Sequence, residues 1–333
     1  MPEVPDPWES LKRPGTVETL VARRVGEALR WPLFWALDAA GQPLLMLQHD
    51  PDIGTEGRLP RFRGMAVERR KPAGEPALVT LRLIRSEFRD VFREFCADVV
   101  RATADAESER EAVGRFITRA WRWQRFLTTG SDGRLSGEEQ KGLLGELRVL
   151  SDIVAPALGI AEAVGTWMGP LGAPKDFEIG RSCVESKAFS GGGVASVRIT
   201  SEHQLSTEAL DALFLVVSQV APSVAGGAVT LPEYVASVRA RIDADAPEAR
   251  QAFDSRLAAS GFDEADDYSD SQWHMGAIRC FRVGKGFPCI TPAQFPSGVH
   301  RVHYRIGLEE CKPFRISHED LEVAIRGQHD DHA

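Results

Sequence analysis

The sequence predicts a mixed α/β (α+β) protein with an N-terminal β-rich lobe, followed by a core in which helices flank a mixed central sheet. Short apolar runs separated by turn residues occupy much of the first third, a pattern typical of strands. After residue 131, segments with helical spacing alternate with strand-like runs, as in a sheet covered by helices. The unbroken run Leu-Phe-Leu-Val-Val at 213–217 predicts a strand buried on both faces.

The first lobe, residues 1–130, is predicted to supply substrate or partner contacts. Ala-Ala-Gly at 39–41 is typical of a hairpin turn between two of its apolar runs. Apolar residues spaced three and four apart predict two helices after the strands. The expected strands span 31–37, 43–48, 61–69 and 77–83, and the expected helices span 86–103 and 108–127. The turn-rich segment 128–133 predicts the boundary with the core.

The core, residues 131–225, is predicted to begin with a helix, because Ser136 and Glu139 have the spacing of a capping box. This helix is expected to end near Pro156, and a hairpin over 176–188 follows it. A third strand over 194–200 and a polar, partly helical link precede the buried strand. Residues 226–333 are expected to complete or flank the core with helices near 231–243 and 246–260, strands near 276–283 and 299–306, and a helix after Ser317.

Composition narrows the class of protein. The 48 acidic and 40 basic residues give a net charge of −8, so a nucleic-acid contact needs a local basic surface or a partner. The five cysteines contain no Cys-x-x-Cys pair and are odd in number, which predicts a reducing cytoplasm rather than a zinc ribbon or a disulfide framework. The first ten residues lack the apolar core of a signal peptide, and no stretch approaches a membrane span.

The strongest candidate site is the hairpin that carries Asp176, Glu185 and Lys187. Asp176 opens an apolar run, a turn at 180–182 follows, and Glu-Ser-Lys lies on the second run. Because strand side chains alternate between faces, Glu185 and Lys187 point the same way, and Asp176 can approach Glu185 if the two runs pair. Two carboxylates and one ammonium on a strand surface can hold a hard divalent cation and position a water beside it.

The Glu-x-Lys spacing is by itself a weak signal. It also occurs at 139–141, on a predicted helix, and at 310–312, which has no acidic hairpin partner just upstream. Residues that are two apart on a helix do not share a face. By spacing alone, the pattern at 185–187 favours a solvated charged face on an edge hairpin.

The helix before the hairpin carries two further signals. Glu146 has Leu143 and Val149 among its helical neighbours, and a carboxylate beside apolar surface is costly without a cation or another partner. Gly142 and Gly145 lie inside the same helix, where each costs roughly 1 kcal/mol against alanine. Close approach of the helix to another backbone would compensate for that cost. These signals favour a site over a solvated face.

Four segments resemble a bacterial family of PD-(D/E)xK proteins, whose members often lie beside restriction, DNA-methylation or other phage-defence genes. They are Gly-Leu-Leu-Gly-Glu at 142–146, Gly-Ala-Pro-Lys-Asp-Phe at 172–177, Val-Glu-Ser-Lys at 184–187, and Val-Arg-Ile-Thr-Ser-Glu-His-Gln-Leu at 197–205. The resemblance implies a restriction-endonuclease-like core from about 136 to 220. One departure is Lys175, which separates the proline from the aspartate at a position where that proline is variable.

The resemblance implies a metal-dependent DNA endonuclease that hydrolyses phosphodiester bonds in restriction or phage defence. Asp176 and Glu185 would be the main metal ligands, with the backbone carbonyl of Ser186 as a third. Lys187 would orient or help deprotonate the attacking water and stabilise the pentacovalent phosphate. Glu146 would be an outer ligand or would hold a metal-bound water. Mg²⁺ suits this all-oxygen set, and Mn²⁺ is the alternative metal.

The sequence indicates substrate and partner contacts less specifically than it indicates the hairpin site. His203 or Gln204 could lie near the scissile phosphate, or could be a helix cap and a partly buried polar residue. The densest basic cluster could face DNA or solvent, and it contains Arg61, Arg63, Arg69, Arg70 and Lys71. Expected partners are DNA, a partner ATPase or DNA methyltransferase, and a second copy in a homodimer. The alternative function is a non-catalytic accessory protein that keeps the nuclease fold to bind DNA or a partner.

Overall fold

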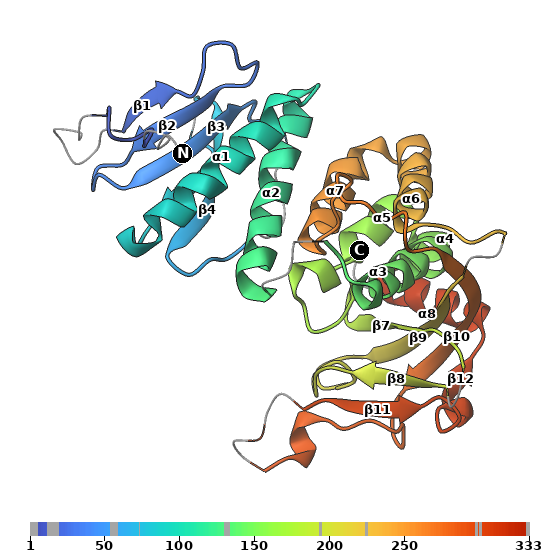
Figure 1. Ribbon diagram of the computed structural model, residues 1–333. Coiled ribbons are helices and arrows are strands. Elements are labelled where there is room, and N and C mark those ends of the chain that lie inside the picture. The colour runs from blue at the N-terminus through green and yellow to red at the C-terminus, as the bar shows by residue number, and fades with distance from the viewer. Residues whose placement is uncertain are drawn as a thin grey trace. The chain divides into compact units, whose positions relative to one another are not determined.

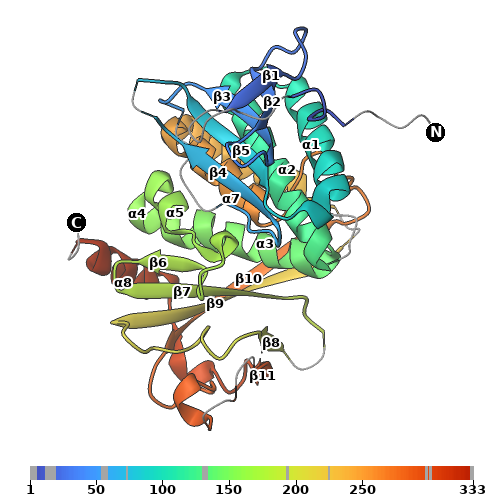
Figure 2. The same ribbon diagram turned by 90° about the vertical axis from the view of Figure 1, so that its left-hand side faces the viewer.

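The chain forms two compact units, Met1–Arg134 with Leu257–Asp263, and Leu135–Arg256 with Glu264–Ala333. The computed structural model of the protein describes residues 6–11, 20–53, 59–72, 74–129, 134–192, 195–223, 226–296, 299 and 302–330. Figure 1 and Figure 2 label the helices and strands along the chain where there is room. Residues 130–133, where the sequence predicts a boundary, lie outside the described residues.

The first unit contains the strands β1 (Val21–Arg24), β2 (Leu33–Leu37), β3 (Pro43–His49), β4 (Met65–Arg70) and β5 (Ala77–Leu83), and the helices α1 (Arg89–Ala104) and α2 (Glu109–Thr129). The strands form one antiparallel sheet in the order β1-β2-β3-β5-β4. The predicted hairpin is confirmed as β2 paired with β3. The strand predicted over 61–69 starts too early, because the chain turns at Gly64, whose φ is 87°. Before that turn, Arg61 forms an isolated bridge to Ala66.

The first unit has a hydrophobic core of its own between the sheet and its two helices. Alternate strand residues such as Leu45, Leu47 and Val79 point to one face of the sheet. They share a buried cluster with Phe95 of α1 and Phe116 of α2, and all five are fully buried. Burial of this much apolar surface is the main force that holds the helices on the sheet.

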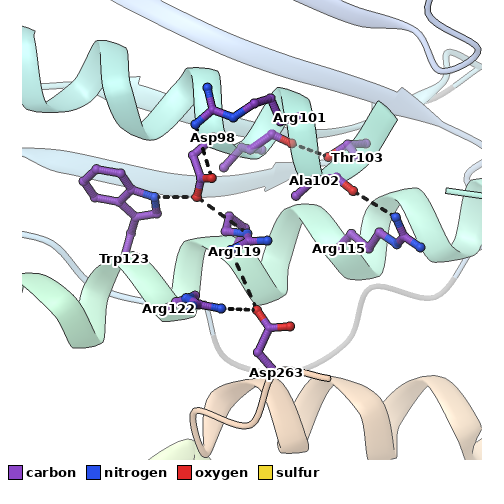
Figure 3. A network of polar contacts seen from close by, with 10 residues as sticks. Asp98, Arg101, Ala102, Thr103, Arg115, Arg119, Arg122, Trp123 and Asp263 are labelled. Carbon is purple, nitrogen blue, oxygen red and sulfur yellow. Dashed lines mark hydrogen bonds and ion pairs between the residues drawn. The ribbon is translucent and has the colours of Figure 1, made fainter. Parts of the chain in front are cut away.

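A network of charged side chains joins α1, α2 and the segment that returns to this unit from the second half of the chain (Figure 3). Asp98 on α1 accepts a hydrogen bond from Trp123 Nε1 at 2.9 Å and pairs with Arg119 at 3.5 Å, both on α2. Arg122 donates to Asp263 of the returning segment at 2.8 Å. The Asp263 side chain is only 14 % exposed, so water screens this pair less than a surface pair. The network therefore helps to fix the returning segment on α2.

The second unit contains the strands β6 (Phe177–Ile179), β7 (Ser182–Phe189), β8 (Ser196–Ile199), β9 (Ala212–Pro222), β10 (Trp273–Val283), β11 (Tyr304–Gly307) and β12 (Arg315–Ile316). Its helices are α3 (Gly137–Val149), α4 (Ala155–Leu158), α5 (Ile160–Thr166), α6 (Leu231–Asp245) and α8 (His318–Asp330). A π-helical turn over Leu150–Val154 links α3 to α4. Helix α7 (Arg250–Ala259) has residues in both units.

Five strands of this unit form a mixed sheet in the order β12-β10-β9-β7-β6, in which β7 and β9 run parallel. β8 and β11 form a separate two-stranded antiparallel ribbon. In Figure 2, α3, α4 and α5 lie on one side of the sheet and the ribbon lies on the other. The protein is thus of the predicted α/β (α+β) class, with helices flanking a mixed central sheet.

Three strand predictions in this unit have different outcomes. The apolar run 213–217 is confirmed as the buried middle of β9. The third strand exists as β8 but lies outside the five-stranded sheet, because β9 occupies that edge of β7 from Ser182 to Phe189. Its predicted first residue, Val194, lies outside the described residues, and the link 201–210 contains turns where a partial helix was predicted. The strand predicted over 299–306 begins only at Tyr304, and residues 300–301 lie outside the described residues.

Helix α3 begins as the sequence predicts and passes close to β7. Ser136 Oγ accepts from the Glu139 N–H, and the Glu139 carboxylate accepts from the Ser136 N–H, which is the predicted capping box. Gly145 faces β7, since a Cβ built there would lie 3.1 Å from Ala188 Cβ. Apart from its chain neighbours and the backbone of its own helix, no described atom lies within 4 Å of a Cβ built at Gly142, so the expected close approach is wrong for that glycine.

Substitutions at the two glycines of α3 are expected to have opposite effects on stability. Gly142→Ala should raise the free energy of unfolding by up to about 1 kcal/mol, because alanine is the better helix former and its methyl group meets open space. Gly145→Val should lower it, because the branched side chain would collide with Ala188 on β7. Urea unfolding followed by circular dichroism tests both changes. Effects of the same sign would contradict the packing of α3 on β7.

Candidate active site

The predicted hairpin holds Asp176 and Glu185 across from each other. β6 and β7 pair antiparallel with Phe177 opposite Val184, so continuing the register by one residue places Asp176 opposite Glu185. Side chains that are directly opposite in such a pair lie on the same face. The Ser186 N–H donates to Asp176 Oδ2 at 2.8 Å, which fixes the aspartate beside the Glu-Ser-Lys run.

Glu185 and Lys187 point to the face of β7 that lies away from α3. Side chains alternate along the strand, so both share a face with Cys183 and Phe189, while α3 packs against the other face at Ala188. Lys187 Nζ donates to Glu185 Oε1 at 2.5 Å. Glu185 Oε2 is buried and has no hydrogen-bond partner among the described residues. A buried carboxylate oxygen without a partner is costly, unless a cation or another ligand binds it.

The alternative of a solvated charged face is therefore wrong for 185–187. β7 is an interior strand, because it pairs with β6 on one side and with β9 on the other. The side chains of Glu185 and Lys187 are 0 % and 16 % exposed. The same spacing at 310–312 behaves as a surface pattern, since Lys312 is 65 % exposed and pairs with Glu309 instead.

Glu146 reaches the same region from α3. Its Oε2 accepts a hydrogen bond from Trp167 Nε1 at 2.8 Å. A Cβ built at Gly169 would lie 2.6 Å from Asp176 Oδ1 and 3.2 Å from Glu146 Oε2, so a larger residue would displace a carboxylate. Sequence reasoning missed Trp167 and Gly169, because no local pattern marks them. The structure thus brings together four predicted residues, Glu146, Asp176, Glu185 and Lys187.

Burial raises the pKa values of three carboxyl groups, and the charge of Asp176 adds to the rise at two of them. Burial, followed by the charge of Asp176, raises the pKa of Glu185 to about 8, although Lys187 opposes this rise. Burial and then the charge of Asp176 also raise the pKa of Glu146 well above its usual range. Burial raises the pKa of Asp176 itself, against the opposing effects of Lys187 and the Ser186 N–H. The ionised forms of these groups therefore lack sufficient positive charge around them.

Lys187 is held in its charged form by its neighbours. Burial acts to lower its pKa, but the charges of Glu185, Asp176 and Glu146 outweigh burial and raise the pKa above its ordinary value. The ammonium group of Lys187 thus faces three carboxyl groups, and the charge of Lys175 also acts on Glu185. A region with this imbalance attracts protons or a metal cation.

A family comparison agrees with this geometry. The family model described as "Putative PD-(D/E)XK family member, (DUF4420)" matches residues 4–309, which is most of the chain. The chain belongs to this family. Membership implies a nuclease-like function, and PD-(D/E)XK nucleases generally use divalent metals and act on DNA. Neither a curated protein nor a solved structure matches the chain.

The residues of this PD-(D/E)XK protein fit a hard divalent cation. Glu185 Oε2 is an orphaned buried oxygen, and Asp176 keeps Oδ1 beyond its bond to the Ser186 N–H. Mg²⁺ is often bound through one or two carboxylates and keeps several waters, so a small set of oxygen ligands is enough. Within the described part of the chain, no group of three or more His, Cys, Asp or Glu side chains is arranged so that all could hold one metal ion as they stand. The role predicted for the Ser186 carbonyl remains a prediction.

Lys175 connects the site hairpin to the loop that carries His203 and Gln204. Lys175 is 9 % exposed, and its Nζ donates to the His203 carbonyl at 2.8 Å. The His203 imidazole is 60 % exposed. Gln204 Oε1 accepts from the Thr200 N–H at 2.8 Å and so closes a turn after β8. The sequence placed Lys175 beside Asp176 but gave no sign of this long-range bond, and substrate contact by His203 or Gln204 remains a prediction.

The predicted basic cluster lies in the first unit, whereas the four converging residues lie in the second. Arg61, Arg63 and Lys71 are exposed, Arg69 is half-buried, and Arg70 pairs with Glu68 at 3.3 Å. Their contact with a substrate remains a prediction.

The sequence also predicted that the cysteines form no disulfide framework and that no segment spans a membrane. All five cysteines are free thiols, and four of them are buried. Within the described ranges, no helix is both long and apolar enough to cross a membrane.

Proposed function

We propose that this protein is a metal-dependent DNA endonuclease that hydrolyses phosphodiester bonds in restriction or phage defence. The observation that carries the proposal is the buried Glu185–Lys187 pair, with Asp176 bonded to the Ser186 N–H between them and one carboxylate oxygen of Glu185 unpartnered. Membership of the PD-(D/E)XK family supports the same reaction class. Mg²⁺ is the metal that we propose, and Mn²⁺ is the alternative.

Each side chain has a proposed task in this reaction. Asp176 and Glu185 would hold the ion, which supplies Lewis-acid polarisation of the phosphate and of a water when bound. Lys187 is charged and fixed by Glu185, so it can orient the attacking water and offset charge that develops on the phosphate. Glu146, held by Trp167, would accept a hydrogen bond from a water at the site.

A non-catalytic scaffold is the alternative function. In a scaffold, the unpartnered carboxylate oxygen of Glu185 would lower the free energy of unfolding without serving a function. Apolar residues of similar volume would make an interior strand more stable. The three carboxyl groups with raised pKa values also carry electrostatic strain that a packing role does not require. Both observations favour the enzyme.

The context of the reaction belongs to the same proposal. We propose that the first unit supplies substrate or partner contacts and that the protein acts in the cytoplasm. A partner ATPase or DNA methyltransferase would provide DNA recognition, which the net charge of −8 does not favour in the chain by itself. A homodimer would allow two sites to cut two strands.

Lys187→Ala is expected to reduce Mg²⁺-dependent nicking of plasmid DNA by at least about 100-fold, as for the loss of a positioned proton-transfer or charge-stabilising group. Lys312→Ala is the matched control, because Lys312 ends another Glu-x-Lys run but lies on the surface. The control should cut like the unmodified protein. Nicking that is absent from all three proteins, or that survives in Lys187→Ala, would count against the nuclease.

A further inference from the structure

The ribbon of β8 and β11 covers the face of the sheet that carries Glu185 and Lys187. Figure 2 shows this ribbon on the side of the sheet away from α3. One buried cluster contains inward-facing residues of the ribbon and of β7, namely Val197, Ile199, Ile306, Cys183 and Phe189. Tyr304 of β11 lies close enough to the Glu185–Lys187 pair for both charges to act on its phenol. The ribbon is therefore packed beside the candidate active site.

The outer face of the ribbon carries two arginines directly opposite each other. Arg198 on β8 and Arg305 on β11 are register partners, and both are exposed. Like charges at such a cross-strand position destabilise the pairing of strands. Arg305 is also held in place, because its Nε and Nη2 donate to Ser196 Oγ at 3.2 and 3.0 Å.

No carboxylate in the described ranges forms an ion pair with Arg198 or Arg305. Elsewhere in the same unit, Arg181, Arg239 and Arg250 each pair with an aspartate. A chain with 48 acidic residues thus leaves two adjacent arginines unmatched on one small sheet. An anion that binds between them would remove their repulsion.

We propose that the outer face of the β8–β11 ribbon binds the phosphate backbone of the DNA substrate through Arg198 and Arg305. This inference rests on the proposed nuclease function and names a surface that positions its substrate. The planar guanidinium fork matches phosphate oxygens and is weakly hydrated, so arginine suits this contact better than lysine. Phosphate contacts fix the register and orientation of a protein on a duplex.

Binding of the full-length protein to a fluorescent DNA duplex, measured by anisotropy in EDTA at several salt concentrations, tests this surface without cleavage. The double substitution Arg198→Ala/Arg305→Ala should weaken binding about equally for unrelated sequences. It should also make the plot of log affinity against log salt shallower by about 0.9 for each phosphate that the arginines no longer neutralise. Arg282→Ala is the matched control, because Arg282 is exposed but pairs in register with Phe214 on the other face of the main sheet. The control should keep the affinity and the slope.

Thermal melting distinguishes weaker DNA binding from a failure to fold. The double variant should melt at the same temperature as the unmodified protein, or higher, because the substitution removes a like-charge pair. If the double variant keeps its DNA affinity and salt slope while the unmodified protein cuts DNA, the proposal that the ribbon binds DNA is wrong. The proposed nuclease function would stand. A preference for RNA over DNA that the double substitution abolishes would overturn the assignment to DNA. An unmodified protein that neither binds nor cuts DNA would overturn the proposed function and this surface together.

Discussion

Glu185→Gln is expected to abolish metal-dependent cleavage and, in the absence of metal, to make the protein more stable than the unmodified chain. The carboxylate is fully buried beside Asp176, and its Oε2 has no hydrogen-bond partner among the described residues. Glutamine has nearly the same shape and still offers an oxygen to Lys187, but it carries no charge. It therefore removes an electrostatic cost while it removes a proposed metal ligand.

The gain in stability should depend on pH in a definite direction. Burial and Asp176 raise the pKa of Glu185 from its ordinary value of 4.5 to about 8 in the folded protein. Between these values the folded state binds more protons than the unfolded state, so the stability of the unmodified protein falls as pH rises. The contribution of this group is fully present below about pH 4.5 and is lost as pH rises through about 8. The advantage of the variant should grow over this window by at most about 1.4 kcal/mol per pH unit.

Chemical unfolding in EDTA at several pH values measures this difference. Glu178→Gln is the matched control, because Glu178 is an exposed carboxylate on β6 of the same hairpin. The control should change the free energy of unfolding little at any pH. If Glu185→Gln is less stable than the unmodified protein near pH 8 without metal, then Lys187 already compensates the buried charge and no cation is needed there.

Local signals in the sequence were enough to predict the part of the site that lies on one hairpin. The turn before β7 and the alternation of side chains set which residues face each other, because both follow from neighbouring residues. Glu146 was also predictable, since helical spacing places it among apolar neighbours. The burial of Glu185 was not predictable, because it depends on β9 pairing with β7 and on the β8–β11 ribbon, which covers the face that carries Glu185.

The remaining parts of the site depend on contacts between residues distant in sequence. Gly142 and Gly145 look alike in the sequence, and only the packing of α3 on β7 distinguishes them. Lys175 holds the His203 carbonyl across a separation of 28 residues. β8 pairs with β11 more than 100 residues later, which creates the Arg198–Arg305 pair that no local pattern indicates. Pairing of this kind is set by the whole fold and not by local propensity.

Divalent metal is expected to stabilise the unmodified protein, and more strongly near pH 8 than near pH 6. A ligand that binds only the folded state adds about 2.7 kcal/mol at a concentration 100 times its Kd. Because burial raises the pKa values of Glu185, Asp176 and Glu146, acidic pH leaves these carboxyl groups protonated and unable to bind a cation. Raising the pH ionises them, so the melting temperature should respond more to Mg²⁺ or Mn²⁺.

Two variants make this metal effect specific to the site. Glu185→Gln should lose most of the metal-induced rise in melting temperature, because it lacks a proposed ligand. Lys187→Ala should keep or enlarge that rise while it loses cleavage, because its ammonium competes with the cation for the same carboxylates. This opposite response separates metal binding from catalysis within one pair of neighbouring side chains. A melting temperature that does not change with millimolar Mg²⁺ or Mn²⁺ at either pH would favour the non-catalytic scaffold. Glu185 and Lys187 would then form a buried ion pair with a structural role only.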